Sequence, residues 1–276
     1  MYGNLFVYDE KYKLVAFESD SSSTQCFIFL GGLTDGLLSL SYLPRLNESL
    51  LQLSYSLIQP LLRSSNLQFG WHTINNDIED LQNLIDYLIK QRKNLKSIIL
   101  MGHSTGCQDI VHYFRQEKQS DLIRGIILQG PVSDRQYLST LPSTKDQLEY
   151  CIQHHENIHE WLPRSLHDPP LTIERCLSLN KFNSIEDLFS SDLSDEQVKK
   201  IYEKINLPNM WIWSKQDEYV PDEIKEEVGK FVKTKLADRT NSKFILLENS
   251  DHAISNEHEQ IYMIDQIIQF IQSIHE

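Results

Sequence analysis

Residues 97–114 read SIILMGHSTGCQDIVHYF. The run SIILM predicts a buried strand, and CQDIVHYF carries apolar residues at helical spacing. Between them, residues 102–106 fit the pattern G-x-S-x-G, which on its own is short enough to arise by chance. A strand, a sharp turn and a helix together are the setting in which such a serine stands exposed at the carboxyl end of a sheet. Ser104 is therefore the candidate nucleophile.

Small residues on both sides of Ser104 favour this interpretation. Gly102 and Gly106 would allow the strand and the helix to approach closely, while the turn strains the serine backbone. The N-terminus of the following helix would favour negative charge that develops nearby. The alternative is a tight turn with an idle serine, and the flanking strand and helix argue against it.

A serine hydroxyl is a poor nucleophile until a base takes its proton, and that base needs an orienting acid. In this setting the partners should follow in the order serine, aspartate, histidine. Asp217 follows the apolar run MWIW and His252 follows FILLE, so both should lie at the same edge of the sheet as Ser104. The rival acids are Glu218, Asp222 and Asp134.

Backbone N–H groups that could bind an oxyanion are expected in two places. The N–H of Thr105, the residue after the candidate nucleophile, is the first. The second should come from the loop GGLTDG at residues 31–36, where Leu33 N–H is the favoured donor. A plain glycine turn is the alternative interpretation of this loop.

Strand-like and helix-like segments alternate through most of the chain. The strand candidates are residues 5–8, 14–17, 26–30, 51–57, 97–101, 125–129, 210–213 and 244–247. The helix candidates are residues 74–90, 107–119, 223–236 and 260–274. This alternation predicts an α/β fold with a mostly parallel central sheet flanked by helices on both faces, edged by an antiparallel hairpin.

One long segment breaks the alternation. Residues 134–206 contain no convincing strand, but polar helix-like pieces interrupted by four prolines. An insertion of this length between two strands predicts a helical cap over the active face. Because no linker or internal repeat is visible, we expect a single domain over residues 1–276, with the cap at about residues 134–206.

Composition excludes several classes of partner. The formal net charge of −13 disfavours nucleic acid, which is bound through Lys and Arg, and disfavours anionic membranes. No apolar run is long enough for membrane insertion, and the first residues lack a signal peptide. The cysteines show no zinc-site spacing and mostly lie in apolar runs, which favours reduced thiols and a cytoplasmic location. They are Cys26, Cys107, Cys151 and Cys176.

One segment of the expected cap matches a metal-binding pattern. His155, Glu156 and His159 fit H-E-x-x-H, and Glu174 could supply a third ligand. On an α-helix the two histidines would share one face. The flanking residues are highly polar, however, so a solvated cap helix is the preferred interpretation. We expect no metal and no cofactor.

The blocks FLGGLTDGLLSLSYL, MGHSTGCQDIVHYF and GIILQGPVSDR resemble a family of fungal α/β-hydrolases grouped under a domain of unknown function. SKQDEYVP and NSDHA extend the resemblance into the second half of the chain. That family includes esterases of fusarinine-type siderophores. The resemblance implies an esterase site at Ser104, Asp217 and His252, with the Gly-Gly-Leu-Thr-Asp-Gly loop binding the oxyanion.

Residues 66–73 depart from the Ser/Gly-rich loop of that family, because they contain Phe69, Trp71 and His72. We expect Trp71, with Gly32 and Asp35, to contribute to substrate binding. The predicted function is hydrolysis of a small-molecule ester by a serine esterase that forms an acyl-enzyme, with siderophore esters as candidate substrates. A thioesterase or lipase-like hydrolase and a non-catalytic binding protein remain the alternatives, and the sequence leaves the oligomeric state open.

Overall fold

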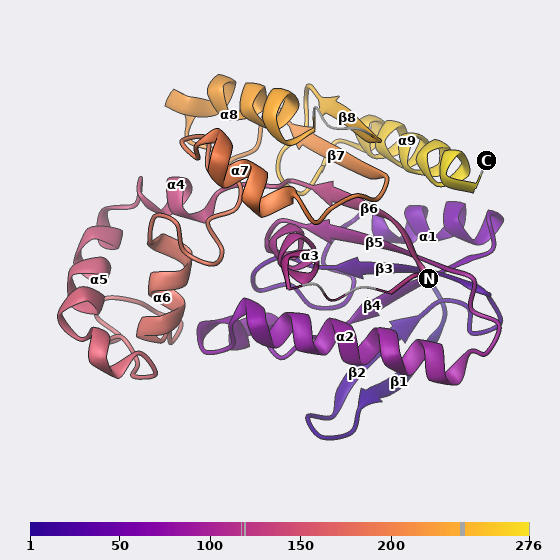
Figure 1. Cartoon of the computed structure of the whole chain (residues 1–276), viewed down its shortest axis with the longest axis horizontal. Helices are drawn as coiled ribbons and strands as arrows, with labels where there is room; N and C mark the ends of the chain where they lie inside the picture. The colour runs from indigo at the N-terminus through magenta and orange to yellow at the C-terminus, as the bar shows by residue number, and fades with distance from the viewer. Residues whose placement is uncertain (117, 119, 238–240, 276) are drawn as a thin grey trace.

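A computed structural model describes residues 1–116, 118, 120–237 and 241–275 of the chain. In this part of the chain, eight strands form one sheet in the order β1-β2-β4-β3-β5-β6-β7-β8 (Figure 1). The strands are β1 (Asn4–Asp9), β2 (Leu14–Glu18), β3 (Gln25–Leu30), β4 (Tyr55–Pro60), β5 (Ser97–His103), β6 (Ile123–Gln129), β7 (Asn209–Ser214) and β8 (Ser242–Leu247). The pairs β1–β2 and β2–β4 are antiparallel and the others parallel, which confirms the predicted sheet and its edge hairpin.

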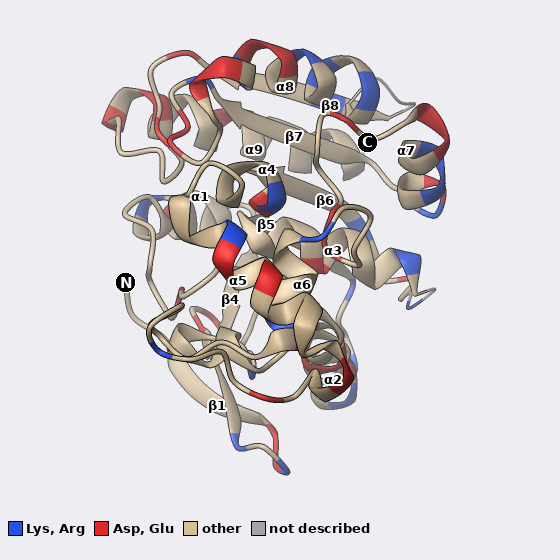
Figure 2. Cartoon of the chain, turned by 90° about the vertical axis from the view of Figure 1, so that its left-hand side faces the viewer, with Lys and Arg blue, Asp and Glu red and all other residues tan. Residues whose placement is uncertain are grey.

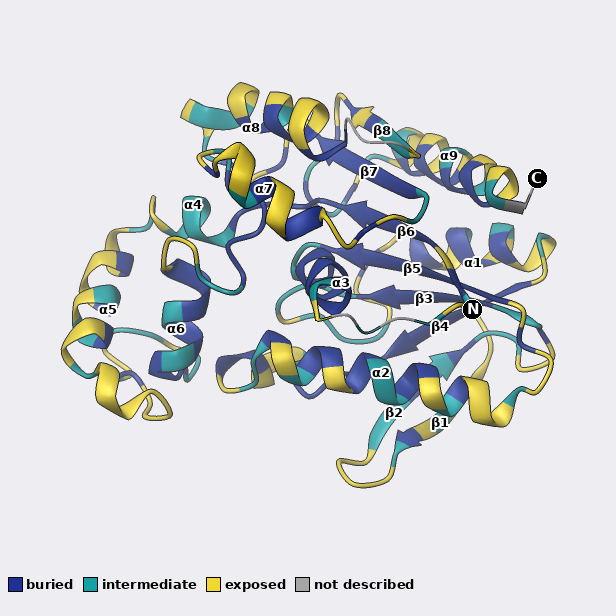
Figure 3. Cartoon of the chain, in the orientation of Figure 1, coloured by how far each residue is buried: buried dark blue, intermediate teal, exposed yellow. Residues whose placement is uncertain are grey.

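Alternation along the central strands builds a core on each face of the sheet. Ile98 and Leu100 of β5 pack toward α2 (Ile74–Gln91) and α3 (Thr105–Arg115). Ile99 and Met101 point to the opposite face, toward α1 (Leu43–Gln52) and α9 (Glu257–His275). Figure 3 shows the result, with buried strands between helices whose outer turns are exposed.

The strand expected at residues 51–57 is corrected, because it begins later, at Tyr55, and continues to Pro60. Its first residues belong to the end of α1, a helix that the sequence reading missed. The alternation of LQLSYSL hides this boundary: Leu50 is buried by helical periodicity, and Ser54 turns the chain with a φ of 59°. A helix end followed by a strand start therefore reads as one alternating strand.

Two expected helices also differ in detail. The helix expected at residues 107–119 spans Thr105–Arg115, and its expected positions 117 and 119 lie outside the described residues. The helix expected at residues 223–236 is divided into η3 (Asp222–Ile224), α8 (Lys225–Phe231) and η4 (Val232–Leu236), the last a π-helical turn. Both segments contribute buried apolar residues to the core.

Residues 134–206, called the insertion from here on, join β6 to β7 without a strand. They contain α4 (Asp134–Leu138), α5 (Pro142–Gln153), η2 (His155–Asn157), α6 (Ile173–Asn180) and α7 (Asp195–Tyr202). Figure 1 shows α4, α5 and α6 beyond the carboxyl ends of the strands, and in Figure 2 α5 and α6 lie in front of the sheet. Phe69, from the loop after β4, is buried in a small apolar cluster with Cys151 and Cys176 of the insertion. The insertion is therefore packed onto the main body at that loop.

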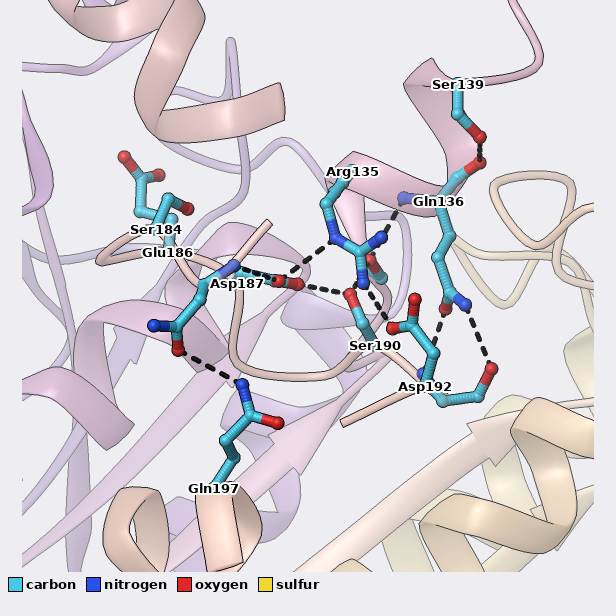
Figure 4. A network of polar contacts seen from close by, with 12 residues as sticks. Arg135, Gln136, Ser139, Ser184, Glu186, Asp187, Ser190, Asp192 and Gln197 are labelled. Atoms are coloured by element: carbon cyan, nitrogen blue, oxygen red, sulfur yellow. Dashed lines mark hydrogen bonds and ion pairs between the residues drawn. The ribbon is translucent and has the colours of Figure 1, made fainter. Parts of the chain in front are cut away.

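A polar network holds the insertion together (Figure 4). Arg135 of α4 donates from Nε to Asp187 at 3.0 Å and pairs with Asp192. Asp187 also accepts hydrogen bonds from Ser190 and from the Asn183 backbone N–H. These contacts fix residues 183–192, which have no regular structure of their own, against α4.

None of the described helices is long and apolar enough to span a membrane. On the face seen in Figure 2, Lys and Arg are interspersed with Asp and Glu.

Candidate active site

Ser104 occupies a strained turn between β5 and α3. Its φ of 54° and ψ of −123° lie in a region that costs a non-glycine residue about 1–3 kcal/mol. The Ser104 N–H donates to the Gln129 carbonyl at 3.0 Å, which ties the turn to β6. A Cβ on Gly102 would lie 2.4 Å from the Gly106 carbonyl oxygen. A larger residue at position 102 would therefore keep the strand and the helix from lying this close together.

His252 and Asp217 are hydrogen-bonded to each other. The distance from His252 Nδ1 to Asp217 Oδ2 is 2.7 Å, and the second Asp217 oxygen accepts from the Tyr219 backbone N–H at 2.9 Å. Asp217 is fully buried and His252 almost so. Because Nδ1 donates to the carboxylate, Nε2 of the neutral imidazole is an acceptor. Nε2 has no hydrogen-bond partner among the described residues.

Negative charges around the imidazole of His252 oppose the effect of burial on its pKa. Burial alone would favour neutral His252, but the hydrogen bond and charge of Asp217, followed by the charges of Glu218 and Asp134, raise its pKa above the ordinary value. The imidazolium is therefore better stabilised here than in water. This is the property required of a base that holds a proton during a reaction.

The rival acids have other partners. Glu218 accepts a hydrogen bond from the backbone N–H of His252 at 2.9 Å, not from the ring. Asp134 accepts from Gln108 at 2.6 Å, and burial raises its pKa to about 6. Asp222 is exposed and pairs with Lys225. Among these four carboxylates, only Asp217 bonds to the imidazole.

Ser104 and His252 line one cavity of about 520 Å³. Its floor comes from the ends of β-strands and the loops that follow them, and its walls come from the insertion. The apolar lining includes Leu33, Leu40, Leu67, Phe69, Val132, Leu138, Leu171 and Leu179. A cavity of this size, lined by both apolar and polar side chains, is typical of a small-molecule site.

The loop GGLTDG is folded against Ser104. Asp35 Oδ2 accepts from the Gly32 N–H at 2.7 Å, and the Asp35 N–H donates back to the Gly32 carbonyl at 3.1 Å. A Cβ on Gly32 would lie 2.7 Å from the Ser104 Cβ. Gly32, Leu33 and Asp35 line the cavity, and Thr105 lines a smaller adjoining one of about 30 Å³ with them. No described residue accepts a hydrogen bond from the N–H of Leu33 or Thr105.

The chain is similar to known proteins over most of its length. The family model described as "Protein of unknown function (DUF1749)" matches residues 2–272. The chain belongs to this family. A UPF0613 protein of Schizosaccharomyces pombe is 30% identical over an aligned length of 223 residues, with 72% of this chain and 70% of that protein covered. Fusarinine C esterase sidJ of Aspergillus fumigatus is 26% identical, with 95% of this chain and 93% of that protein covered.

Solved structures confirm the α/β-hydrolase fold of this DUF1749 chain. The siderophore hydrolase EstB from Aspergillus fumigatus superposes with a TM-score of 0.80 at 27% identity, covering 99% of this chain and 97% of that one. An alpha/beta hydrolase fold protein of unknown function has a TM-score of 0.73 at 22% identity, with 99% and 96% covered. The predicted resemblance to the fungal α/β-hydrolase family that includes siderophore esterases is therefore confirmed.

The expectation for Trp71 is corrected. Trp71 does not line the cavity, but is 40% exposed and packs edge-to-face on Trp161 of the insertion, with ring centroids 5.4 Å apart. The 3₁₀ helix η1 (Asn66–Gly70) instead turns Phe69 inward, so that Phe69 is buried and lines the cavity. Sequence position alone does not distinguish these two aromatic residues, because their directions depend on the turn of η1.

The helix expected around the H-E-x-x-H pattern is also corrected. The α-helix ends at Gln153, and residues 155–157 form a 3₁₀ turn in which His155 Nδ1 lies 2.9 Å from the Ile152 carbonyl. His159 is highly exposed and pairs with Glu174 at 3.2 Å. The described residues contain no group of three His, Cys, Asp or Glu side chains positioned to hold a metal ion.

Sequence reasoning missed the role of Gln129, the last residue of β6. Its Oε1 accepts from His103 Nδ1 at 2.6 Å and from Tyr42 Oη at 3.1 Å, and its Nε2 donates to the His252 carbonyl at 3.0 Å. Burial, and then the neighbouring His252, lower the pKa of His103 to about 3, so this ring stays neutral. A glutamine that ends a strand beside the G-x-S-x-G turn was the available signal.

Proposed function

We propose that this DUF1749 protein is an esterase with Ser104 as nucleophile, His252 as general base and Asp217 as the orienting acid. One observation carries the proposal. The Asp217–His252 pair leaves Nε2 without a partner on a cavity that it shares with Ser104, which itself stands on a strained turn. A serine, an aspartate and a histidine, in this chain order and in this setting, are the residues that carry out acyl transfer in serine hydrolases.

The reaction follows from these parts. Ser104 Oγ attacks the ester carbonyl while His252 Nε2 takes the hydroxyl proton, and the carbonyl oxygen becomes an oxyanion. The free N–H groups of Leu33 and Thr105 stabilise that oxyanion. The intermediate then collapses to an acyl-enzyme, and His252 gives its proton to the departing alcohol. Water repeats the sequence and releases the acid, so no cofactor or metal takes part.

For the substrate, we propose a small-molecule ester of the siderophore type. Support comes from the two Aspergillus fumigatus relatives, whose names describe a fusarinine C esterase and a siderophore hydrolase. The insertion supplies part of the cavity wall and would act as the cap that sets substrate shape. The apolar side chains that line the cavity also fit the acyl chains of ordinary esters.

Covalent labelling tests the nucleophile. A fluorophosphonate probe should modify the protein, and the label should disappear in Ser104→Ala. Ser39→Ala is the matched control, because Ser39 lines the same cavity but has no place in the reaction, and this variant should be labelled normally. A series of p-nitrophenyl esters from acetate to palmitate, followed by fusarinine-type esters and thioesters, then identifies the bond. Persistent labelling of Ser104→Ala would contradict the proposal.

A further inference from the structure

Two buried polar side-chain atoms, each on a residue that lines the cavity, lack a hydrogen-bond partner among the described residues. One is His252 Nε2, which the proposed reaction uses. The other is Asn180 Oδ1, to which the reaction gives no role. Leaving a buried acceptor without a donor costs about 1–3 kcal/mol, so such an atom inside a binding cavity calls for a partner.

The orientation of the Asn180 amide is fixed by its own helix. Asn180 is the last residue of α6 and is only 8% exposed. Its Nδ2 donates to the Cys176 carbonyl, one turn earlier, at 2.9 Å. A carbonyl can only accept, so Nδ2 and not Oδ1 must face Cys176. Oδ1 therefore remains the free atom of this amide.

The rest of the cavity cannot supply the missing donor as a charged side chain. No Lys or Arg is among the described residues that line it, whereas three carboxylates are. Those carboxylates are Asp35, Asp134 and Glu218, and each already accepts a protein hydrogen bond. The wall thus offers acceptors and negative charge, which suits a ligand that brings a hydrogen-bond donor and repels one that brings a carboxylate.

We propose that Asn180 Oδ1 accepts a hydrogen bond from an N–H or O–H group of the ester substrate. Asn180 is then a specificity-determining residue, and the enzyme prefers esters that carry such a donor over esters with a methylene in its place. A site built around a buried acceptor rejects the analogue that cannot fill it, because the acceptor is then left unpaired. This inference rests on the proposed esterase function.

Pairs of matched substrates test the proposed hydrogen bond to Asn180 Oδ1. The p-nitrophenyl esters of N-acetylglycine, N-acetyl-β-alanine and N-acetyl-γ-aminobutyrate place an N–H at three distances from the reacting carbonyl. Each is compared with the ester in which a methylene replaces that N–H. The unchanged protein should favour at least one N–H ester by about tenfold in kcat/KM, and Asn180→Leu should abolish this preference, so that the two members of the pair react at similar rates.

Two further variants separate the acceptor from its surroundings. Asn180→Asp keeps an acceptor oxygen but loses the Nδ2 bond to Cys176, so it should retain the preference. Leu179→Val changes a neighbouring apolar wall residue and should affect both members of a pair alike. Equal rates for every pair in the unchanged protein, or a preference that survives in Asn180→Leu, would overturn the inference alone. Hydrolysis of no ester at all would overturn the proposed function and this inference with it.

Discussion

Gln129 Nε2 donates a hydrogen bond to the backbone carbonyl of His252 at 3.0 Å. The same side chain accepts from the ring of His103, which immediately precedes Ser104, and its backbone carbonyl accepts from the Ser104 N–H. One fully buried residue thus joins the serine turn to the histidine loop, although the two are about 150 residues apart in sequence. The position of His252 relative to Ser104 depends on this link.

Replacing Gln129 by Met should therefore reduce turnover more than binding. Methionine has a similar length but leaves His103, Tyr42 and the His252 carbonyl without their partner, each a buried polar group. We expect kcat to fall by about ten- to a hundredfold with little change in KM. Tyr42→Phe, which removes only one contact to Gln129, is the control and should retain most activity. Equal effects of the two substitutions would show that the link to His252 is not what matters.

Asp217→Asn should reduce kcat by about 10⁴-fold. An asparagine can offer its amide N–H to His252 Nδ1, which favours the tautomer that cannot accept the serine proton at Nε2. Glu218→Gln is the matched control, since Glu218 bonds to the His252 backbone N–H and not to the imidazole ring. Steady-state ester hydrolysis measures both variants, with circular dichroism to verify folding. A smaller loss of kcat in Asp217→Asn than in Glu218→Gln would show that Asp217 is not the orienting acid.

The pKa that governs the loss of activity at low pH should lie above the ordinary value for histidine. His252 acts as a base only when neutral. Burial lowers the pKa of its imidazole, but the hydrogen bond and charge of Asp217 outweigh burial and raise that pKa above 6.5. As pH falls through this raised pKa, the imidazole becomes protonated and kcat/KM should decrease in proportion. A pH profile of kcat/KM between about pH 5 and 9 measures this pKa. A half-maximal point well below 6.5 would contradict the electrostatic argument.

The parts of the site that were predictable depend on short stretches of sequence. A strand, a G-x-S-x-G turn and a helix are contiguous, so the strained turn at Ser104 follows from residues 97–114 alone. Asp217 and His252 could be placed because each follows its own strand and all parallel strands end at one edge.

Other parts depend on packing between distant segments. Phe69 rather than Trp71 reaches the cavity because η1 packs against the insertion, a contact that no local pattern encodes. Gln129 acquires its role from three partners on other elements. The boundary between α1 and β4 was misplaced because helical and strand periodicity coincide over residues 51–57.

Gly32→Ala should impair the reaction without unfolding the protein. The added Cβ would lie 2.7 Å from the Ser104 Cβ, so the loop that carries Leu33 N–H must move away from the serine. Loss of one oxyanion donor costs about 10²- to 10³-fold in kcat. Gly36→Ala, in the same loop, would meet only the Asn66 side chain at 3.0 Å and is the control. Ester hydrolysis and a thermal melt together separate loop displacement from unfolding, and similar rates for both variants would contradict the proposed donor.

Asp77→Asn should change how stability depends on pH. Asp77 lies in the first turn of α2, and burial raises its pKa from 3.8 to about 7. Between these values the folded state holds a proton that the unfolded state has released, so rising pH favours unfolding. Asparagine does not titrate and escapes this penalty. Urea unfolding at a series of pH values should show the variant gaining about 3 kcal/mol on the unchanged protein from pH 4 to pH 7, and little more above pH 7. Parallel curves across this range would mean that Asp77 ionises in the folded protein as readily as in the unfolded chain.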